Sequence, residues 1–369
     1  MKIIHITLGK ANPERMNGVN KVVNSLITSQ VNIGLDAELW GITHSLTHNY
    51  PKRNYTTRIF QDYSNKFNLD PELINELKKI AFEDVIVHFH GVFLPQVYSA
   101  SRWCKKLKIP YVYTPHGGYN LRAMEKSKTT KLLYLNLLEK KVVRGAKHVH
   151  LIGASEAEGL KKYFNSDQYI LVPNGQDIQF RIEKKVSTSD TLNLIFLGRI
   201  DIKTKGLDIL LEAIAALKGK QKIKLSVVGD GGEMNRLKSL VKELELEQQI
   251  EFVGALFGEE KFRALSEADA LCLVSRNEGL PGVVLEAASV KTPSIISAYT
   301  NMKNYIQDFN AGWCMQKYSV AALTEVLDKV AQLKKEKQLK SFGENAQNMV
   351  ESAFDWNHIA ETLNQHYRA

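Results

Sequence analysis

Short apolar runs alternate with helical stretches along almost the whole chain, and this alternation restricts the fold more than any other feature. Short runs without polar alternation are typical of strands that are buried on both faces. Strands that alternate with helices form parallel sheets, because each helix returns the chain to the same edge. The sequence therefore predicts the α/β class. The expected strands are residues 3–8, 37–40, 85–89, 111–114, 148–152, 169–172, 192–197, 225–228, 250–253, 270–274 and 294–296.

The chain is long enough for two domains. Its 369 residues would make two domains of roughly 180 residues each. Residues 176–190 are mostly polar and contain few large apolar side chains, so we interpret them as the linker. The first domain is then 1–175 and the second is 191–352. Residues 44–68 look irregular, and Asp355 suits the N-cap of the last helix.

The first residues run directly into the first strand, without the pattern of a signal peptide. No apolar run approaches the ~20 residues that a membrane span needs. The three cysteines, Cys104, Cys272 and Cys314, are widely spaced and form no metal or redox motif. They fit a reducing compartment, so we expect a cytoplasmic protein.

Positive charge is concentrated in residues 101–150. The formal net charge of the chain is +9, and this segment holds 12 Lys and Arg residues against 2 Glu. A basic face favours an anionic partner, such as a membrane surface, a diphosphate-linked acceptor or nucleic acid; the alternative is a solvated helix face. Nucleic acid is disfavoured because no binding motif or stacking platform is present. The amphipathic helix expected at 129–144 could lie on a membrane, although a core-facing helix is the commoner outcome.

Two glutamates bracket an expected helix start, in the stretch from Glu278 to Glu286. The stretch follows a buried strand, and ligands bind at the carboxyl ends of strands in open α/β sheets. We expect Pro281 in the first helical position and free N–H groups at 282–284, where they would attract a phosphate. Two acids beside a phosphate would repel it unless they bind hydroxyl groups of the ligand rather than charge. The stretch therefore indicates a nucleotide sugar; the alternative is two solvated acids near a helix start.

Two features of the first half also suggest a ligand site. His116 is followed by two glycines at the end of an expected strand, which suits close approach to a ligand, although a structural loop histidine is the alternative. Gly18 lies in a loop between a strand and a helix, a weak sign of an anion-binding turn. We expect His88 and His90 to face opposite sides of their strand, as poor metal partners with a structural role.

Several separated motifs follow one another along the chain. They are the Gly18 loop, Thr114-Pro115-His116-Gly117, Pro173-Asn174-Gly175-x-Asp177, Gly198-Arg199-Ile200 with Lys203, Lys205 and Gly206, and Glu278 with Glu286. In this order they resemble the retaining glycosyltransferases of the GT-B fold, specifically the large family four, which includes many bacterial polysaccharide and lipid glycosyltransferases. The resemblance spans nearly the whole chain. Its most specific part is the Gly-Arg and Lys-Gly pair together with the spaced glutamates.

The resemblance implies a fold of two Rossmann-like β/α/β domains with a cleft between them. The N-terminal domain would bind the acceptor and the C-terminal domain the nucleotide sugar. A crossover helix at 353–369 would return to the first domain.

The resemblance also assigns roles to residues of the second domain. Arg199 and Lys205 would clamp the diphosphate of the donor. Glu278 would hold sugar hydroxyl groups, Glu286 would hold the ribose, and Val253 would lie beside the base together with Gly254. The N–H groups of Gly282 and Val283 would contact the donor phosphates.

Two further roles fall in the first domain. Gly18 would approach the diphosphate, and His116 would sit beside the donor sugar. The sequence departs from the family pattern at Asn17, where a second glycine is common, and at 279–281, where Gly-Leu-Pro replaces Pro-Phe-Gly. Pro281 has no N–H, so donor contacts would shift to the two residues after it.

The expected activity is retaining, metal-independent transfer of a hexose or N-acetylhexosamine to a glycan or lipid-linked acceptor in bacterial surface polysaccharide biosynthesis. A UDP-sugar is favoured as the donor, with GDP-mannose as the second choice, and no cofactor is implied. No Asp-x-Asp sequence occurs, which agrees with metal independence. The protein would be cytoplasmic and peripheral on the membrane. The alternatives are a GT-B epimerase or hydrolase of sugar nucleotides and a non-catalytic sugar-nucleotide-binding protein; a nicotinamide oxidoreductase is disfavoured because the dinucleotide fingerprint is missing.

Overall fold

The computed structural model describes residues 1–13, 18–125, 127–165, 168–176, 182–185 and 187–369. The chain forms two compact units, Met1–Gly175 with Asp355–Ala369, and Gln176–Phe354. Asn17, Asp177 and part of the expected linker lie outside the described residues.

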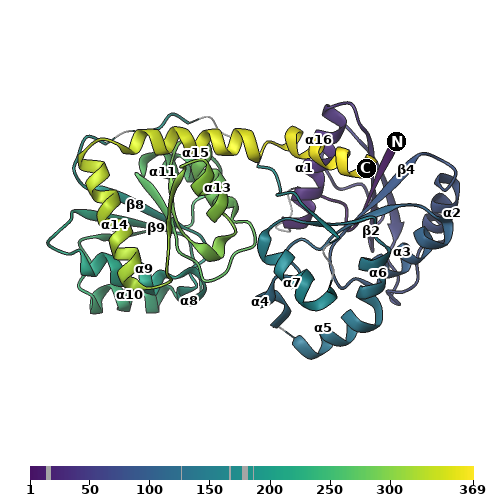
Figure 1. The fold of residues 1–369 in the computed structure, drawn as a ribbon, viewed down its shortest axis with the longest axis horizontal. Helices are drawn as coiled ribbons and strands as arrows, with labels where there is room; N and C mark the ends of the chain where they lie inside the picture. Colours follow the sequence, from purple (N-terminus) through teal and green to yellow (C-terminus); the bar gives the residue numbers. More distant parts are fainter. Residues whose placement is uncertain (14–17, 126, 166–167, 177–181, 186) are drawn as a thin grey trace. The chain divides into compact units, whose positions relative to one another are not determined.

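The first unit is built on a parallel sheet of seven strands in the order β3-β2-β1-β4-β5-β6-β7 (Figure 1). Sequence order reverses between β1 and β4, as in doubly wound folds. The elements are β1 (Lys2–Leu8), α1 (Gly18–Asn32), β2 (Asp36–Thr43), β3 (Thr56–Gln61), α2 (Pro71–Ile80), β4 (Val85–His90), α3 (Pro95–Leu107), β5 (Tyr111–Thr114), α4 (Leu121–Glu125), α5 (Lys128–Tyr134), η1 (Leu135–Glu139), α6 (Lys140–Gly145), β6 (His148–Leu151), α7 (Ala154–Phe164), β7 (Tyr169–Leu171) and α16 (Trp356–Arg368).

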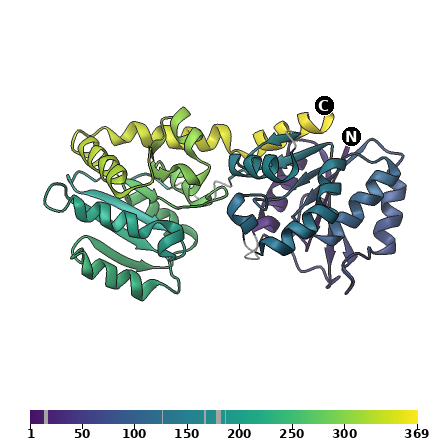
Figure 2. The same ribbon diagram turned by 60° about the horizontal axis from the view of Figure 1, so that its bottom comes forward.

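Each face of this sheet buries its own apolar cluster. Ile3 and Ile86 point to the face that α1 and α16 cover, whereas Ile4 and Val87 point to the face that α2, α3, α6 and α7 cover. Successive side chains of a strand alternate between faces, so apolar residues at every position require helices on both sides. Figures 1 and 2 show α16 beside α1, so the end of the chain completes the core of the first unit.

The expectation that residues 44–68 are irregular is wrong, because they contain the edge strand β3. Only Phe60 of this strand is buried, so the segment lacks the continuous apolar run of an internal strand. The Asp355 N-cap is confirmed, since its carboxylate accepts the N–H groups of Asn357 and His358 at 2.9 and 3.0 Å.

The helix expected at 129–144 is interrupted by the π-helical turn η1. A π turn contains one residue more than an α turn and rotates the following side chains. Glu139 at its end is buried and accepts hydrogen bonds from the hydroxyl groups of Tyr113 and Tyr119. Burial raises the pKa of this carboxyl group. The turn therefore places an acid in the core on an otherwise amphipathic helix.

The second unit holds a parallel sheet of six strands in the order β10-β9-β8-β11-β12-β13. This is the Rossmann order, with the reversal between β8 and β11. Its elements are β8 (Leu192–Leu197), α8 (Ile202–Lys205), α9 (Leu207–Ala216), β9 (Ile223–Val228), α10 (Met234–Glu243), β10 (Ile250–Gly254), α11 (Gly258–Glu267), β11 (Ala270–Leu273), α12 (Gly282–Ser289), β12 (Ser294–Ser297), η2 (Ala298–Thr300), α13 (Lys303–Asp308), β13 (Gly312–Met315), α14 (Val320–Lys335) and α15 (Leu339–Ala353).

The predicted α/β class and both parallel sheets are thus confirmed. Every helix within the described residues is too short or too polar to cross a lipid bilayer.

Candidate functional site

The candidate site of the second unit lies where the strand order reverses. Gly198 and Arg199 follow β8, and the loop of residues 274–281 follows the neighbouring strand β11. Because the strands are parallel, both loops leave the sheet at its carboxyl edge, which is the ligand-binding edge of such folds.

Lys205 and Glu278 meet directly in this place. The Lys205 ammonium donates a hydrogen bond to Glu278 Oε1 at 2.6 Å, and the Ser275 hydroxyl donates to the same oxygen at 2.8 Å. The two charged side chains are only 19% and 15% exposed. Partial burial strengthens the attraction between opposite charges. Two residues 73 positions apart are therefore held in one preformed ion pair, as a shared ligand would require.

A close backbone contact fixes the position of Lys205. Gly206 caps α8 in the left-handed conformation, with φ of +72°. A Cβ atom at this residue would lie 2.2 Å from the Val274 carbonyl oxygen, closer than any side chain can come. The Tyr318 hydroxyl donates to that same oxygen at 2.9 Å. Only glycine lets the Lys205 loop pack this tightly against the end of β11.

Arg276 joins the same two loops and was missed in the sequence. Its guanidinium makes a bidentate contact with Asp208 at 2.8 and 2.9 Å and also donates to the Lys203 carbonyl oxygen at 2.5 Å. A planar guanidinium matches a carboxylate in this way. On the other side, the Asn301 amide donates to the carbonyl oxygens of Glu278 and Gly279.

Arg199 points outward, and its side chain is 74% exposed. Its nearest acid is Asp201 at 3.8 Å. A Cβ atom on the preceding residue, Gly198, would lie 4.0 Å from Cε of Lys205. The backbone that carries Arg199 thus passes beside Lys205, and the long side chain is free to turn toward a ligand there.

The helix α12 begins one residue later than expected, because Pro281 is its N-cap rather than its first residue. Val284 was expected to offer a free N–H, but it donates to the Pro281 carbonyl oxygen at 3.0 Å. Gly282 and Val283 are the first two residues of the helix, where N–H groups have no partner within the helix. The phosphate-binding capacity therefore rests on these two residues.

Glu286 lies on the same helix and pairs with Lys261 of α11. The two charged groups are 2.7 Å apart, and their side chains are 18% and 20% exposed. Lys261 is not part of any motif in the sequence, so sequence analysis could not identify it as a site residue. Val253, near the end of β10, is 41% exposed, as a surface beside a base would be.

In the first unit, Gly18 is exposed and begins α1, and residues 14–17 lie outside the described residues. His116 follows β5 and has a φ of +50°, a conformation that is uncommon for residues other than glycine. Its Nε2 lies 2.9 Å from Nδ1 of His90. Both the strained backbone and the ring contact fix the orientation of this side chain.

Glu156 holds the loop after His116. Its carboxylate accepts the N–H groups of Gly117 at 2.6 Å and Ile152 at 3.0 Å. The side chain is buried, and burial raises its pKa to about 7. Sequence analysis missed this residue, because a single acid near a helix start is common and gives no specific signal.

The expectation that His88 and His90 face opposite sides of β4 is wrong. Residues i and i+2 of a strand point to the same face, and both rings contact His5 of the neighbouring strand. His5, His88 and His90 form a group in which one ring nitrogen from each residue lies within 4.8 Å of the other two. These side chains are all buried.

Two family models match the chain. The model described as Glycosyltransferase Family 4 matches residues 16–180, and the model described as Glycosyl transferases group 1 matches residues 177–349. Together they cover both units.

Individual relatives agree with these models. Over 177 residues the chain is 29% identical to N-acetyl-alpha-D-glucosaminyl L-malate synthase of Bacillus anthracis. The aligned region covers 48% of this chain and 45% of that protein. Over 172 residues it is 33% identical to a GalNAc-alpha-(1->4)-GalNAc-alpha-(1->3)-diNAcBac-PP-undecaprenol alpha-1,4-N-acetyl-D-galactosaminyltransferase of Campylobacter jejuni, covering 46% of this chain and 45% of that protein. The matches thus span less than half the length of these two relatives.

The fold has a close counterpart among solved structures. Sucrose-phosphate synthase from Thermosynechococcus elongatus superimposes with a TM-score of 0.70, at 20% identity, over 100% of this chain and 98% of that one. The two Rossmann-like units are therefore those of the GT-B fold. The chain belongs to the family of glycosyltransferases that these two models describe, group 1 in its C-terminal half and family four in its N-terminal half.

Proposed function

We propose that the protein transfers a hexosyl or N-acetylhexosaminyl group from a nucleotide sugar to a glycan or lipid-linked acceptor, with retention of configuration and without a metal. A UDP-sugar is the favoured donor, and GDP-mannose is the second choice. The observation that carries the proposal is the preformed pair of Lys205 and Glu278 at the reversal point of the second sheet.

The charges of this place suit a sugar pyrophosphate. As the bond between the anomeric carbon and the diphosphate breaks, negative charge develops on the leaving group. Lys205 and the first N–H groups of α12 would stabilise that charge, because they are fixed before the reaction begins, and Arg199 would turn toward the diphosphate and add a second cation. Glu278 would accept hydrogen bonds from sugar hydroxyl groups while it orients the Lys205 ammonium.

Retention follows if the acceptor attacks from the face that the phosphate leaves. The acceptor oxygen then forms the new bond to the anomeric carbon, and its proton passes to an oxygen of the departing diphosphate. This route requires no nucleophile from the protein.

The second pair extends the site toward the nucleoside. Glu286 would accept the ribose hydroxyl groups, and Lys261 would hold the carboxylate in place at 2.7 Å. Val253 would lie beside the base.

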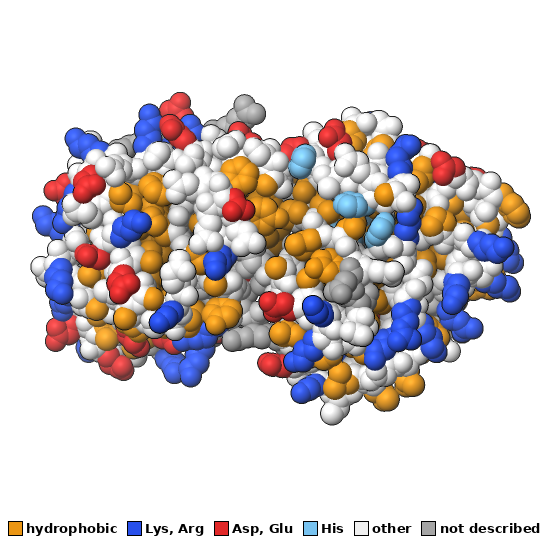
Figure 3. Space-filling view, in the orientation of Figure 1, with side chains coloured by type: hydrophobic (Ala, Val, Ile, Leu, Met, Phe, Trp, Pro, Cys, Tyr) orange, Lys and Arg blue, Asp and Glu red, His pale blue; other side chains and the backbone are white. Residues whose placement is uncertain are grey.

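The acceptor side of the proposal rests on relatives and charge. The Campylobacter jejuni relative is named as acting on an undecaprenol-linked diphosphate. In this chain, Lys and Arg side chains gather over the part of the first unit that contains α3, α5 and α6 (Figure 3). A surface of this kind would attract anionic lipid headgroups or a lipid diphosphate, and we place the protein in the cytoplasm at the membrane.

A calorimetric titration with UDP, GDP, ADP and their sugars tests the donor site. We expect Lys205→Ala to weaken nucleotide binding at least about tenfold, which corresponds to the loss of one charged hydrogen bond. Lys203→Ala is the matched control, because Lys203 lies on the same short helix but its side chain is exposed. Equal affinities of the two variants would contradict the assigned site.

One product assay separates the proposed reaction from its rivals, and one binding assay tests the membrane surface. Incubation with donor alone should release little free sugar, whereas an epimerase or hydrolase would convert the donor without an acceptor. Sedimentation with anionic vesicles should depend on salt; equal binding to neutral vesicles would argue against the basic surface.

A further inference from the structure

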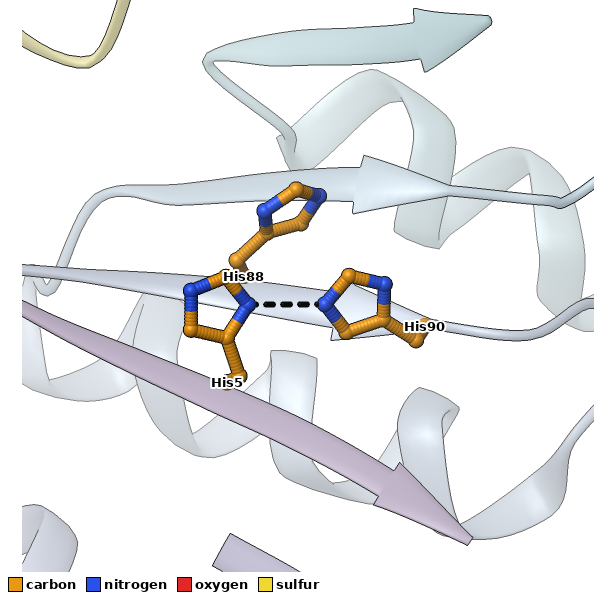
Figure 4. Close-up of side chains that lie close together, drawn as sticks. All are labelled: His5, His88 and His90. Atoms are coloured by element: carbon orange, nitrogen blue, oxygen red, sulfur yellow. Dashed lines mark hydrogen bonds between the residues drawn. The ribbon is translucent and has the colours of Figure 1, made fainter. Parts of the chain in front are cut away.

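A chain of hydrogen bonds runs through the first unit and ends at His116. On the face of the sheet that α1 and α16 cover, Gln30 Oε1 lies 2.7 Å from His5 Nε2, and His5 Nδ1 lies 2.9 Å from His90 Nε2. His90 Nδ1 then lies 2.9 Å from His116 Nε2. Figure 4 shows the His5 and His90 rings edge to edge, joined by this bond. We call these four residues the histidine chain.

A second series of hydrogen bonds lies beside the histidine chain. His88 contacts the Tyr367 hydroxyl at 2.7 Å through Nδ1 and the Thr114 hydroxyl at 2.6 Å through Nε2. Thr114 in turn contacts His150 at 2.9 Å, and His150 contacts the Val172 carbonyl oxygen at 2.8 Å.

These partners explain the histidine cluster without a metal ion. The six ring nitrogens of His5, His88 and His90 each have a polar partner. A metal would have to break several of these bonds inside a core that is 0–1% exposed at all three residues. The geometry therefore favours a hydrogen-bonded chain over a metal site.

The rings of the histidine chain are neutral at physiological pH. Burial lowers the pKa of His5 to about 4 and that of His116 to about 3, and it lowers the pKa of His90 well below its usual value. A neutral imidazole carries one N–H and one lone pair. Each ring that donates at one nitrogen must therefore accept at the other.

This rule determines which ring nitrogen carries the proton in each histidine of the histidine chain, starting from Gln30. The amide oxygen can only accept, so His5 carries its proton on Nε2 and accepts on Nδ1. His90 must then donate from Nε2 and accept on Nδ1. His116 must donate from Nε2, which leaves the lone pair on its Nδ1.

We propose that Gln30, His5 and His90 are positioning residues that hold His116 in one tautomer, with its Nδ1 lone pair available to accept a hydrogen bond from a sugar hydroxyl group. This inference rests on the proposed function for the identity of the ligand. His116 follows β5 at the carboxyl edge of the sheet, where ligands of such folds bind. Its partly exposed side chain is the one member of the chain that is not buried.

The direct test needs no substrate. Nitrogen NMR of the full-length protein, labelled at histidine, reports the protonated nitrogen of each ring and the coupling between two nitrogens across a hydrogen bond. We expect protons on Nε2 of His5, His90 and His116, with couplings between the first and second and between the second and third rings. A proton on Nδ1 of His116, or stoichiometric transition metal bound to the cluster, would overturn the proposal.

A variant of the middle ring tests the consequence. In His90→Phe the coupling to His116 should disappear, and the His116 nitrogens should show exchange between both tautomers. We expect kcat/KM for transfer to fall about tenfold, the equivalent of one lost hydrogen bond. An unchanged His116 spectrum or unchanged kcat/KM would reject the positioning role.

Thr114→Val is the matched control, because it breaks the second series but leaves the histidine chain intact. It should preserve the His116 tautomer and kcat/KM, and a loss equal to that of His90→Phe would instead indicate a general packing defect. Should the wild type bind no nucleotide sugar, the proposed function fails, whereas the NMR pattern still decides the tautomer.

Discussion

Replacement of Gly206 by alanine should destabilise the second unit for two separable reasons. The left-handed backbone at φ of +72° costs a residue with a Cβ about 1–2 kcal/mol. The added carbon would also lie 2.2 Å from the Val274 carbonyl oxygen and 2.7 Å from the Tyr318 hydroxyl. Such overpacking typically costs about 1–3 kcal/mol. We therefore expect Gly206→Ala to lower the free energy of unfolding by about 3 kcal/mol.

Gly219 provides the control that isolates the steric part. Its φ is +80°, and no atom would come within 4 Å of an added Cβ. Gly219→Ala should therefore lose only the backbone contribution of about 1–2 kcal/mol. The difference between the two variants measures the contact between the Lys205 loop and the end of β11.

Urea unfolding followed by circular dichroism measures both variants, with the slope compared to confirm that the same transition is observed. In Gly206→Ala the displaced loop should also separate Lys205 from Glu278, so that nucleotide affinity falls together with stability. Equal free energies of unfolding for the two variants would refute the reasoning, as would a Gly206→Ala variant with full nucleotide affinity.

Three further changes follow from the charged and titratable groups. Acidification from about pH 7.5 to about pH 5 should lower the free energy of unfolding, because the pKa values of His5 and His150 are about 4 in the folded state and near 6.5 in the unfolded chain. The unfolded state then binds more protons, which lowers the free energy of unfolding by about 2 kcal/mol per ring. Urea midpoints that do not change between these pH values would contradict this prediction. Glu156 opposes this trend, since its pKa of about 7 lets the folded state take up a proton as pH falls, so Glu156→Gln should make the pH dependence steeper; an unaltered dependence would argue against a raised pKa. Arg276→Lys should cost about 1–2 kcal/mol, because an ammonium cannot reproduce the bidentate contact with Asp208; thermal unfolding at the wild-type temperature would argue against it.

The central strands of both sheets could be predicted because they are buried on both faces. Such strands must be apolar at successive positions, and this pattern is visible in residues 85–89 and 270–274 without any structure. The edge strands β3 and β13 were missed because they are only partly buried, so their residues lack a continuous buried run. The pattern therefore reveals central strands better than edges.

The residues of the candidate site also fall into those that the sequence could reveal and those that it could not. Lys205 and Glu278 could be proposed because both lie in motifs at strand ends, and the structure brings them together. Lys261 and Arg276 could not be identified, because a single charged residue acquires its role only from a partner far away in the sequence. The cluster of His5, His88 and His90 was obscured by an error in strand geometry rather than by a missing signal, since His88 and His90 are two residues apart and therefore face the same side of β4.

The last helix, α16, has a consequence for how the protein is made. Trp356, Ile359 and Leu363 complete the apolar cluster on one face of the first sheet, and Tyr367 reaches His88 in its interior. On the ribosome, the first unit therefore cannot finish folding when residue 175 emerges. It must wait, without α16 on that face of its sheet, until residues 355–369 have been synthesised, and a premature stop after residue 354 would leave part of that face open to chaperones and proteases.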